Sequence, residues 1–360
     1  MTMVFALGTN AIAAQYVSIN DLKEETKGGW HETYHVNGEA VVLDVDIEIP
    51  DINRVPVVKI RYPVDIQPIN PPPNADILLS RDGFSYSIES KPKTIFGGNV
   101  SGTRNRSLGI GVQAENSPLT ADEAVVFARE LFFPYVEQTN IDYDLLYVDA
   151  FSRLYKVKDS NASGVVGDYG KPITEMGCYT VQFRQSFYGI PYVRTAPPFI
   201  NPPKSKIIPA APRGDIVLTV ASPNDYAILF HPAIEDGIVE EDVPLAPFLK
   251  VKKEFERLIE AGYIKAVYKV RLEYVRMNNP DDIENSAILV PVWELNGTIV
   301  QNPKSPGPLP SFSEAQLQFI KEVGGAQEVL VDAQTAVYYD PQDNRANRGD
   351  ANIITWNEVK

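Results

Sequence analysis

The order of apolar and polar residues between Pro247 and Val275 predicts a helix followed by a strand. From Pro247 to Gly262 the apolar residues recur at spacings of three and four, as in an amphipathic helix. They are Phe248, Val251, Phe255, Leu258 and Ile259. From Ala266 to Val275 the period becomes two, which is typical of a half-buried strand. Its apolar set is Tyr268, Val270, Leu272 and Tyr274, and its polar set is Lys269, Arg271, Glu273 and Arg276.

The residues that follow predict further strands. Ala287 to Leu295 is apolar almost throughout, as in a central strand covered on both faces, although Pro291 favours an edge or a bulge. Glu328 to Asp340 contains two short runs around a turn at 332–335, which predicts a hairpin. One helix lying on a small antiparallel sheet is the simplest arrangement that buries these faces.

The same order occurs earlier in the chain. Leu119 to Phe133 predicts a helix that begins with a capping box of Thr120 and Glu123 and ends before Pro134. Strand patterns follow at Asp144 to Lys156 and at Cys178 to Gln185. We therefore expect two helix-on-sheet modules, related by a structural duplication with little sequence identity. Phe312 to Val323 predicts one more helix, with Ser313 and Gln316 as its capping box.

The N-terminal part is predicted to be rich in strands. Two β-prone runs are joined by Asn37-Gly38, a dipeptide typical of a type I′ turn, and the second run, Glu39 to Ile49, predicts one strand. We expect little fixed structure in 15–30. Residues 80–117 are expected to hold short strand-like pieces and the glycine-rich Gly97 to Gly111, with a mobile loop at Gly109-Ile110-Gly111. The expected class is α+β, with a flexible segment (1–30), a β-rich region (31–117), a first module (118–196), a proline-rich linker (197–212), a second module (213–342) and a polar tail (343–360).

Composition narrows the choice of partners. The chain has 47 acidic and 33 basic residues and a net charge of −14, which disfavours nucleic acid and anionic lipid. No run of 18 apolar residues is present, so we expect no transmembrane segment. The start of the chain, 1–14, is mildly apolar and contains Ala11-Ile12-Ala13, a candidate cleavage site, but it lacks the basic residues that begin a secretory signal. Two interpretations stay open: the tail of a signal that starts upstream, and a disordered arm. The single Cys178 excludes an internal disulfide, and we expect it to be a buried apolar residue.

The most suggestive motif is His31-Glu32-Thr33-Tyr34-His35, which matches the pattern of zinc proteases. That chemistry requires a helix, because only there do positions i and i+4 bring two imidazoles to one metal. Gly28-Gly29 and Asn37-Gly38 flank the motif and predict a hairpin instead. On a strand, the two histidines would stand about 13 Å apart, at about 3.3 Å per residue. We therefore assign no metal or catalytic role to the motif.

Other candidates have structural explanations too. Asp44, Asp46 and Glu48 share one face of a predicted strand, and a straight strand offers a single row of oxygens rather than a calcium cage. Gly109-Ile110-Gly111 lacks the third glycine of a nucleotide site. Arg-Gly-Asp occurs twice in polar segments, at 213–215 and 348–350, and we attribute both to chance. His231 precedes Pro232 in an apolar run and is expected to be structural. We assign no catalytic, cofactor-binding or metal-binding residue.

Two segments resemble known extracytoplasmic modules. Phe183 to Val193 resembles the strand, turn and "G-I-P-V" strand of PepSY-type modules and of propeptides of thermolysin-like proteases. Val292-Trp293 together with the segment 331–336 is similar to the end of a second such module, "V-D-A-x-T-G", with Ala336 where glycine is usual. The layout also resembles uncharacterised extracytoplasmic lipoproteins of clostridia and other Firmicutes. It is more distantly similar to the YycH and YycI proteins, which restrain a sensor kinase.

The resemblance implies a secreted or surface-held, non-catalytic protein of a Gram-positive bacterium, with PepSY-like or cystatin-like modules. A lipobox cysteine is missing from this chain. We expect a binding or regulatory protein without a cofactor that engages a protein or peptide through its sheet surfaces. Two alternatives stay open: a zinc-dependent or carboxylate-based hydrolase, and a surface protein that binds carbohydrate.

Overall fold

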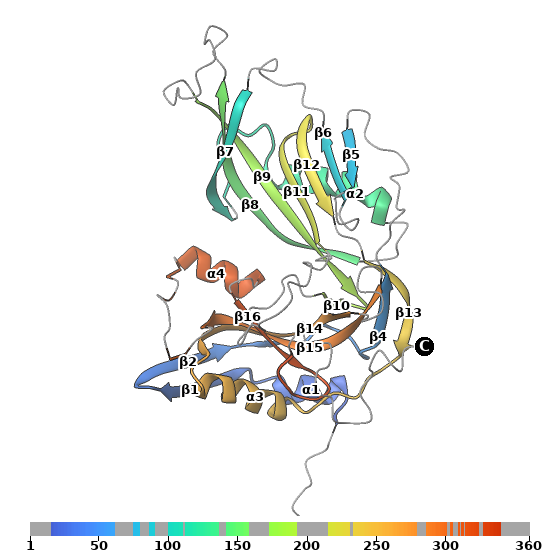
Figure 1. Ribbon diagram of the computed structural model, residues 1–360, viewed down its shortest axis with the longest axis vertical. Helices are drawn as coiled ribbons and strands as arrows, with labels where there is room; N and C mark the ends of the chain where they lie inside the picture. Colours follow the sequence, from blue (N-terminus) through green and yellow to red (C-terminus); the bar gives the residue numbers. More distant parts are fainter. Residues whose placement is uncertain are drawn as a thin grey trace, which may run out of the picture.

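The computed structural model shows an α+β protein with two large sheets and one separate hairpin (Figure 1). It contains four helices and sixteen strands among the residues that it describes. Those residues are 16–61, 75–79, 86–90, 100–110, 112–136, 142–157, 173–192, 215–230, 233–278, 286–300, 303–304, 309, 311–312, 314–323 and 327–339.

The eight-stranded sheet has the order β5-β6-β12-β11-β9-β8-β7, with β10 paired to β9. Helix α2 (Ala121–Val136) covers one face of this sheet, where Ala124, Ala128 and Phe132 pack against Tyr179 and Val181. The strands are β5 (Ala75–Leu79), β6 (Tyr86–Ser90), β7 (Val100–Ile110), β8 (Asp142–Val157), β9 (Ile173–Phe187), β10 (Ile190–Pro191), β11 (Asp215–Ser222) and β12 (Asp225–Phe230).

The six-stranded sheet has the order β13-β4-β15-β14-β3, with β16 paired to β15. Its apolar face packs on helix α3 (Phe248–Glu260), where the ring centroids of Phe248 and Trp293 lie 4.9 Å apart. The strands are β3 (Ile47–Glu48), β4 (Val57–Arg61), β13 (Ile234–Glu240), β14 (Ile264–Asn278), β15 (Ser286–Ile299) and β16 (Gln327–Asp332). Helix α1 (Ile19–Thr26) and the hairpin of β1 (Trp30–Val36) and β2 (Glu39–Val45) lie on the α3 side of the sheet, and α4 (Glu314–Val323) lies on its other side (Figure 1).

The eight-stranded sheet is an insertion in the unit built on the six-stranded sheet. Its strands all lie between residues 75 and 230, whereas the six-stranded sheet draws on residues before 62 and after 233. The strands therefore do not follow the expected module ranges, since β11 and β12 come after the proline-rich segment 197–212 yet join the earlier sheet. That segment and the tail 343–360 lie outside the described residues.

The β9–β10 hairpin joins the two units. Phe187, Ile190 and Tyr192 are buried in the same apolar core as α3 and β15, and Tyr192 forms a parallel bridge with Tyr274. The Gln185 amide donates to the carbonyl of Ala233 at 3.1 Å and accepts from its N–H at 3.2 Å. The strand, turn and strand expected at Phe183–Val193 are present as far as Tyr192.

Several local predictions are confirmed. All five apolar positions of the 247–262 pattern are buried in α3, and Gly262 has a φ of 81° just after it. Asn37 and Gly38 have φ values of 53° and 84°, as a type I′ turn requires. The Thr120–Glu123 capping box opens α2. The hairpin around 332–335 is formed too, with Asp332 Oδ1 accepting from the N–H groups of Gln334 and Thr335.

Other local predictions were wrong. The segment 15–30 contains α1, which opens with a capping box of Ser18 and Asp21. Gly109 and Ile110, expected in a mobile loop, are the last residues of the strand β7, with Gly109 at a bulge opposite β8. Helix α2 continues through Pro134 to Val136. The run from Glu39 to Ile49 breaks at Asp46 into β2 and β3, which belong to different sheets.

The two long strands of the six-stranded sheet also differ from expectation. Strand β15 is central, as predicted, but Pro291 is at neither an edge nor a bulge. Pro291 lies where the neighbour of β15 changes from β4 to β16. Its carbonyl points to that side and accepts the N–H of Ala333. The ring nitrogen of Pro291, which has no N–H to donate, points to the same side, so no hydrogen bond to β14 is lost. Strand β14 is not half-buried: Lys269, Arg271 and Glu273 on its polar face are all buried.

Candidate binding site between the two sheets

The open face is the side of the eight-stranded sheet that points away from α2. On β9, Tyr179, Val181 and Phe183 point to the α2 core, so Thr180, Gln182 and Arg184 lie on the open face. Residues directly opposite one another in a ladder share a face. The open face therefore also includes Tyr147, Asp149, Val217, Thr219 and Ala227.

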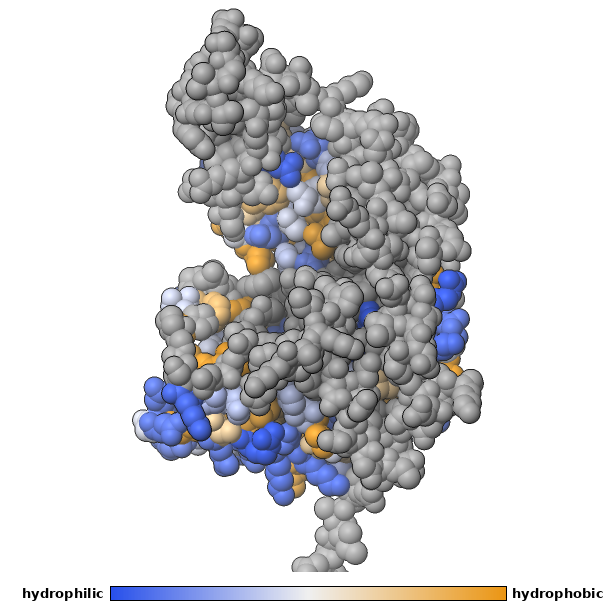
Figure 2. All heavy atoms as spheres, viewed as in Figure 1, coloured by the Kyte–Doolittle hydropathy of each residue, from blue (hydrophilic) through white to orange (hydrophobic). Residues whose placement is uncertain are grey.

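The open face has a partly exposed polar region and a buried one: Gln182, Cys178 and Phe151 lie on it and are buried, the last two in a small apolar cluster with Ala221. Thr180, Thr219 and Asp149 are each partly exposed, and α2 is the helix that packs in this sheet's apolar core among the described elements. Burial raises the pKa of the Asp149 carboxyl. Figure 2 shows a hollow in the molecular surface between this sheet and the six-stranded unit, with polar and apolar side chains mixed on its wall. The hollow therefore offers hydrogen-bonding groups on a rigid sheet.

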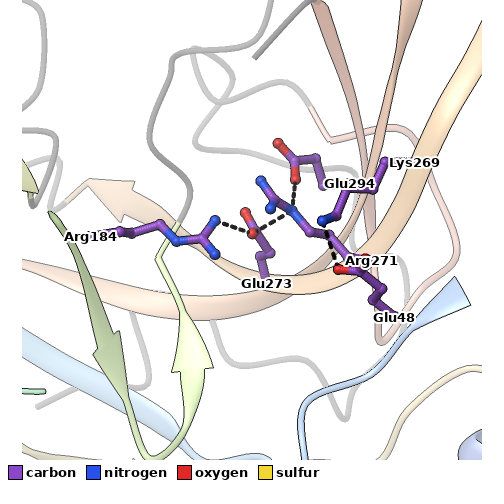
Figure 3. Close-up of polar contacts among 6 residues, drawn as sticks. All are labelled: Glu48, Arg184, Lys269, Arg271, Glu273 and Glu294. Carbon is purple, nitrogen blue, oxygen red and sulfur yellow. Dashed lines mark hydrogen bonds and ion pairs between the residues drawn. The ribbon is translucent and has the colours of Figure 1, made fainter. Parts of the chain in front are cut away.

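A cluster of ion pairs lies at the base of the open face, where β9 meets β14 (Figure 3). Arg184 Nη1 is 2.6 Å from Glu273 Oε1, and Arg271 Nε is 2.5 Å from the same oxygen. Arg271 also bonds to Glu294 on β15. Lys269 Nζ lies 2.9 Å from Glu48 Oε2 on β3. Arg184 is the member of this cluster that comes from the eight-stranded sheet, so it ties the two units together.

Burial controls the charges in this cluster. The side chains of Glu273 and Glu294 are fully buried, and that of Arg184 is 11% exposed. Burial and the neighbouring Glu294 raise the pKa of Glu273 to about 7, against the attraction of Arg271 and Arg184. Burial alone would raise the pKa of Glu294 too, but Arg271 lowers it below its usual value. The two carboxyls therefore differ in pKa: that of Glu273 is raised to about 7, whereas that of Glu294 is lowered.

The cluster retains unused hydrogen-bonding capacity. Arg184 Nε, Glu273 Oε2 and Glu294 Oε1 are buried and have no hydrogen-bond partner within the described part of the chain. Buried polar groups without partners are uncommon in folded proteins because each costs about 1–3 kcal/mol. Because these atoms are buried, they belong to the interior of the junction between the two units and are not open to solvent.

The zinc-protease motif lies on a strand, as predicted. His31 and His35 are on β1, and His31 Nδ1 is 2.7 Å from Asp44 Oδ1 on the neighbouring strand. That carboxylate raises the pKa of His31. Glu32 bonds to Lys252 of α3 and to the Tyr34 hydroxyl, which also lies 2.7 Å from Glu256 Oε1. The motif's glutamate thus fastens the hairpin to α3.

The other candidates are dispersed. Asp44 pairs with His31, whereas Glu48 pairs with Lys269 in a different sheet. Cys178 is fully buried within β9, and burial raises the pKa of its thiol to about 11. Among the described residues, no group of three or more His, Cys, Asp and Glu side chains is placed to hold a metal. His231 and both Arg-Gly-Asp tripeptides, apart from Asp215 at the start of β11, lie outside the described residues.

The alternation along the chain places Lys269, Arg271 and Glu273 on the polar face of a predicted half-buried strand but does not predict the cluster. One signal was available: Glu294 stands inside the apolar run 287–295, where a lone carboxylate in a central strand needs a buried cation. The strand opposite it supplies Arg271.

The fold is similar to that of a solved structure. No family model matches the chain, and no curated protein matches it. The crystal structure of an uncharacterised protein from Eubacterium rectale aligns over 89% of this chain and 96% of that one, with 15% identity and a TM-score of 0.48. Within the described residues, no helix is both long enough and apolar enough to cross a bilayer.

Proposed function

We propose that this protein is a non-catalytic binding protein that holds a protein or peptide segment on the open face of its eight-stranded sheet. The observation that carries the proposal is the asymmetry of that sheet. One face is packed against α2, whereas the other presents half-buried threonine, tyrosine and carboxyl groups beside a hollow (Figure 2). Polar groups on a preformed concave surface suit the recognition of a hydrogen-bonding ligand such as a peptide backbone.

The junction between the two units supports the proposal. The β9–β10 hairpin is buried in the core of the six-stranded unit, and Arg184 is paired with Glu273 at the base of the hollow. A surface fixed in this way loses little conformational freedom when it binds, which favours affinity.

We further propose that the protein acts outside the cytoplasmic membrane of a Gram-positive bacterium and is no hydrolase. The resemblance to PepSY-type modules and Firmicutes lipoproteins supports the location. The extended conformation of 30–36 argues against the zinc-hydrolase alternative, because His31 and His35 do not share a helical turn. Fractionation of the source cells with an antibody against the chain tests the location, and recovery in the cytosol alone would contradict it.

Peptide selection on the purified protein tests the binding proposal. A random peptide library is panned on the full chain, and the enriched peptides are titrated against three variants by fluorescence anisotropy. Thr180→Arg and Thr219→Arg place a long cationic side chain on the open face. Val126→Arg places the same side chain on α2, where Val126 is 54% exposed on the opposite side of the sheet.

We expect both threonine variants to weaken binding at least tenfold and Val126→Arg to leave it unchanged. Circular dichroism of all three variants checks that the fold is kept. Peptides that bind all variants equally, or a library from which nothing is enriched, would rule out the open face as the binding surface.

A further inference from the structure

A second hollow lies at the junction of α1, the segment 51–54 and the β9–β10 turn. Its volume is about 510 Å³, which falls in the range of about 300–1,000 Å³ that holds small ligands. It is lined by Asn20, Lys23, Asp51, Ile52, Asn53, Arg54 and Tyr188. None of these residues belongs to the open face, so this hollow is a separate place on the molecule.

The charged groups of this hollow are already paired. Lys23 Nζ lies 3.3 Å from Asp51 Oδ1 and donates to the carbonyl of Ile52 at 2.7 Å. Arg54 pairs with Glu241. Each cation that lines the hollow thus has its own carboxylate, so the wall carries no excess charge to attract a phosphate or a carboxylate.

Two amides remain available on the same wall. Asn20 and Asn53 are exposed, and neither side chain has a hydrogen-bond partner in the described part of the structure. A side-chain amide offers two donors and one acceptor, so it can bond to two neighbouring hydroxyl groups at once. The hollow therefore carries free hydrogen-bonding groups that are neutral.

An aromatic ring completes the wall. Tyr188 has a φ of 54° and is followed by Gly189 with a φ of 78°, close to the values of 53° and 84° for Asn37-Gly38 in the β1–β2 hairpin. A left-handed conformation costs a residue with a Cβ about 1–2 kcal/mol, and asparagine or glycine is preferred there. Tyr188 is held in place by Arg54, 5.6 Å above its ring, and by a 2.7 Å bond from its hydroxyl to Glu235.

We propose that this hollow binds a neutral saccharide. Arg54 covers one face of the Tyr188 ring, so the other face would offer an apolar surface to the C–H groups of a sugar. Asn20 and Asn53 would offer donors and acceptors to its hydroxyls. The paired charges disfavour acidic sugars and phosphates. The use of tyrosine at a turn position that favours asparagine is consistent with selection for the ring rather than for the backbone.

An array of immobilised oligosaccharides tests the proposal with the full chain. The array carries neutral oligomers of glucose, galactose, xylose and N-acetylglucosamine, together with sialylated and sulfated glycans. We expect binding to neutral glycans only. The best ligand is then titrated in solution against Asn53→Ala, Tyr188→Asn and the control Asn224→Ala, an exposed asparagine in the β11–β12 turn.

Asn53→Ala and Tyr188→Asn should each weaken binding at least tenfold, whereas Asn224→Ala should bind as the wild type does. Asn53 makes no contact that the fold needs, so its loss of binding cannot come from unfolding. Binding to no glycan, a preference for sialylated or sulfated glycans, or equal binding by all variants would overturn the proposal. The open-face variant Thr180→Arg should bind the glycan normally, which separates this site from the proposed peptide site.

Discussion

Removing the charge of Glu273 should make the protein more stable at alkaline pH. The carboxyl has a pKa of about 7 in the folded protein, raised by burial and by Glu294 from 4.5 in the unfolded chain. Between pH 4.5 and 7 the folded protein keeps the Glu273 proton that the unfolded chain has lost. The free energy of unfolding therefore falls as pH rises from 4.5 through 7. Raising the pKa of Glu273 from 4.5 to about 7 lowers the free energy of unfolding above pH 7 by about 3 kcal/mol, at about 1.36 kcal/mol per pKa unit.

Glu273→Gln replaces the carboxyl by a neutral group of the same shape, so it removes this cost. Below pH 4.5 the wild type is protonated at Glu273 in both states, and the two proteins should differ least. Towards pH 8 the variant should gain up to about 3 kcal/mol in unfolding free energy relative to the wild type. The measurement is urea unfolding at several pH values between 4.5 and 8.

The pKa of Glu294 is lowered rather than raised, so its contribution is lost only in acid, below this pH window. Glu24→Gln, at an exposed position on α1, is the matched control and should follow the wild type at every pH. A free-energy difference between Glu273→Gln and the wild type that stays constant from pH 4.5 to 8 would refute the reasoning.

Three further predictions concern single features. Ala336 has a φ of 57°, so Ala336→Gly should raise the unfolding free energy by about 0.5–1 kcal/mol, and an unchanged or lower thermal midpoint would contradict this. The buried Cys178, whose thiol has a pKa of about 11, should react with a thiol reagent such as DTNB only when the protein is unfolded, and rapid labelling of the native chain would be inconsistent with its burial. Because His31 and His35 lie on a strand, neither zinc nor EDTA should shift the thermal midpoint, and a zinc-dependent rise that His35→Ala abolishes would show that the histidines bind metal.

The features that the sequence predicted well are those set by near neighbours. The apolar positions of α3, the Asn37-Gly38 turn and the Thr120–Glu123 capping box each depend on residues within a few positions of one another. Helix α1 was missed because it is short and polar, although Ser18 and Asp21 spell the same capping signal. The end of strand β7 was wrongly expected to be a loop because Gly109-Ile110-Gly111 is rich in glycine, whereas pairing with β8 holds Gly109 and Ile110 in a sheet.

The candidate site depended on contacts that no local pattern reports. Period-two alternation shows that the two faces of β14 differ, but it does not show what covers each of them. Arg184 meets Glu273 only because the β9–β10 hairpin is buried in the other unit, a contact between residues far apart in the chain. Likewise, Gly28-Gly29 and Asn37-Gly38 predicted the strand at His31–His35 but not that Glu32 would reach Lys252 on α3.

The insertion of one unit into the other determines how the protein can be made. Strand β4 pairs with β15 in the centre of the six-stranded sheet, yet the whole eight-stranded sheet is synthesised between them. During translation, the segment that contains β4 is synthesised before β15, the strand it pairs with, so its apolar side chains stay exposed until β15 is made. The inserted unit in turn carries the β9–β10 hairpin, whose apolar side chains are buried in the core of the six-stranded unit. We expect neither unit to be soluble when expressed alone, so useful truncations would trim only the ends of the chain.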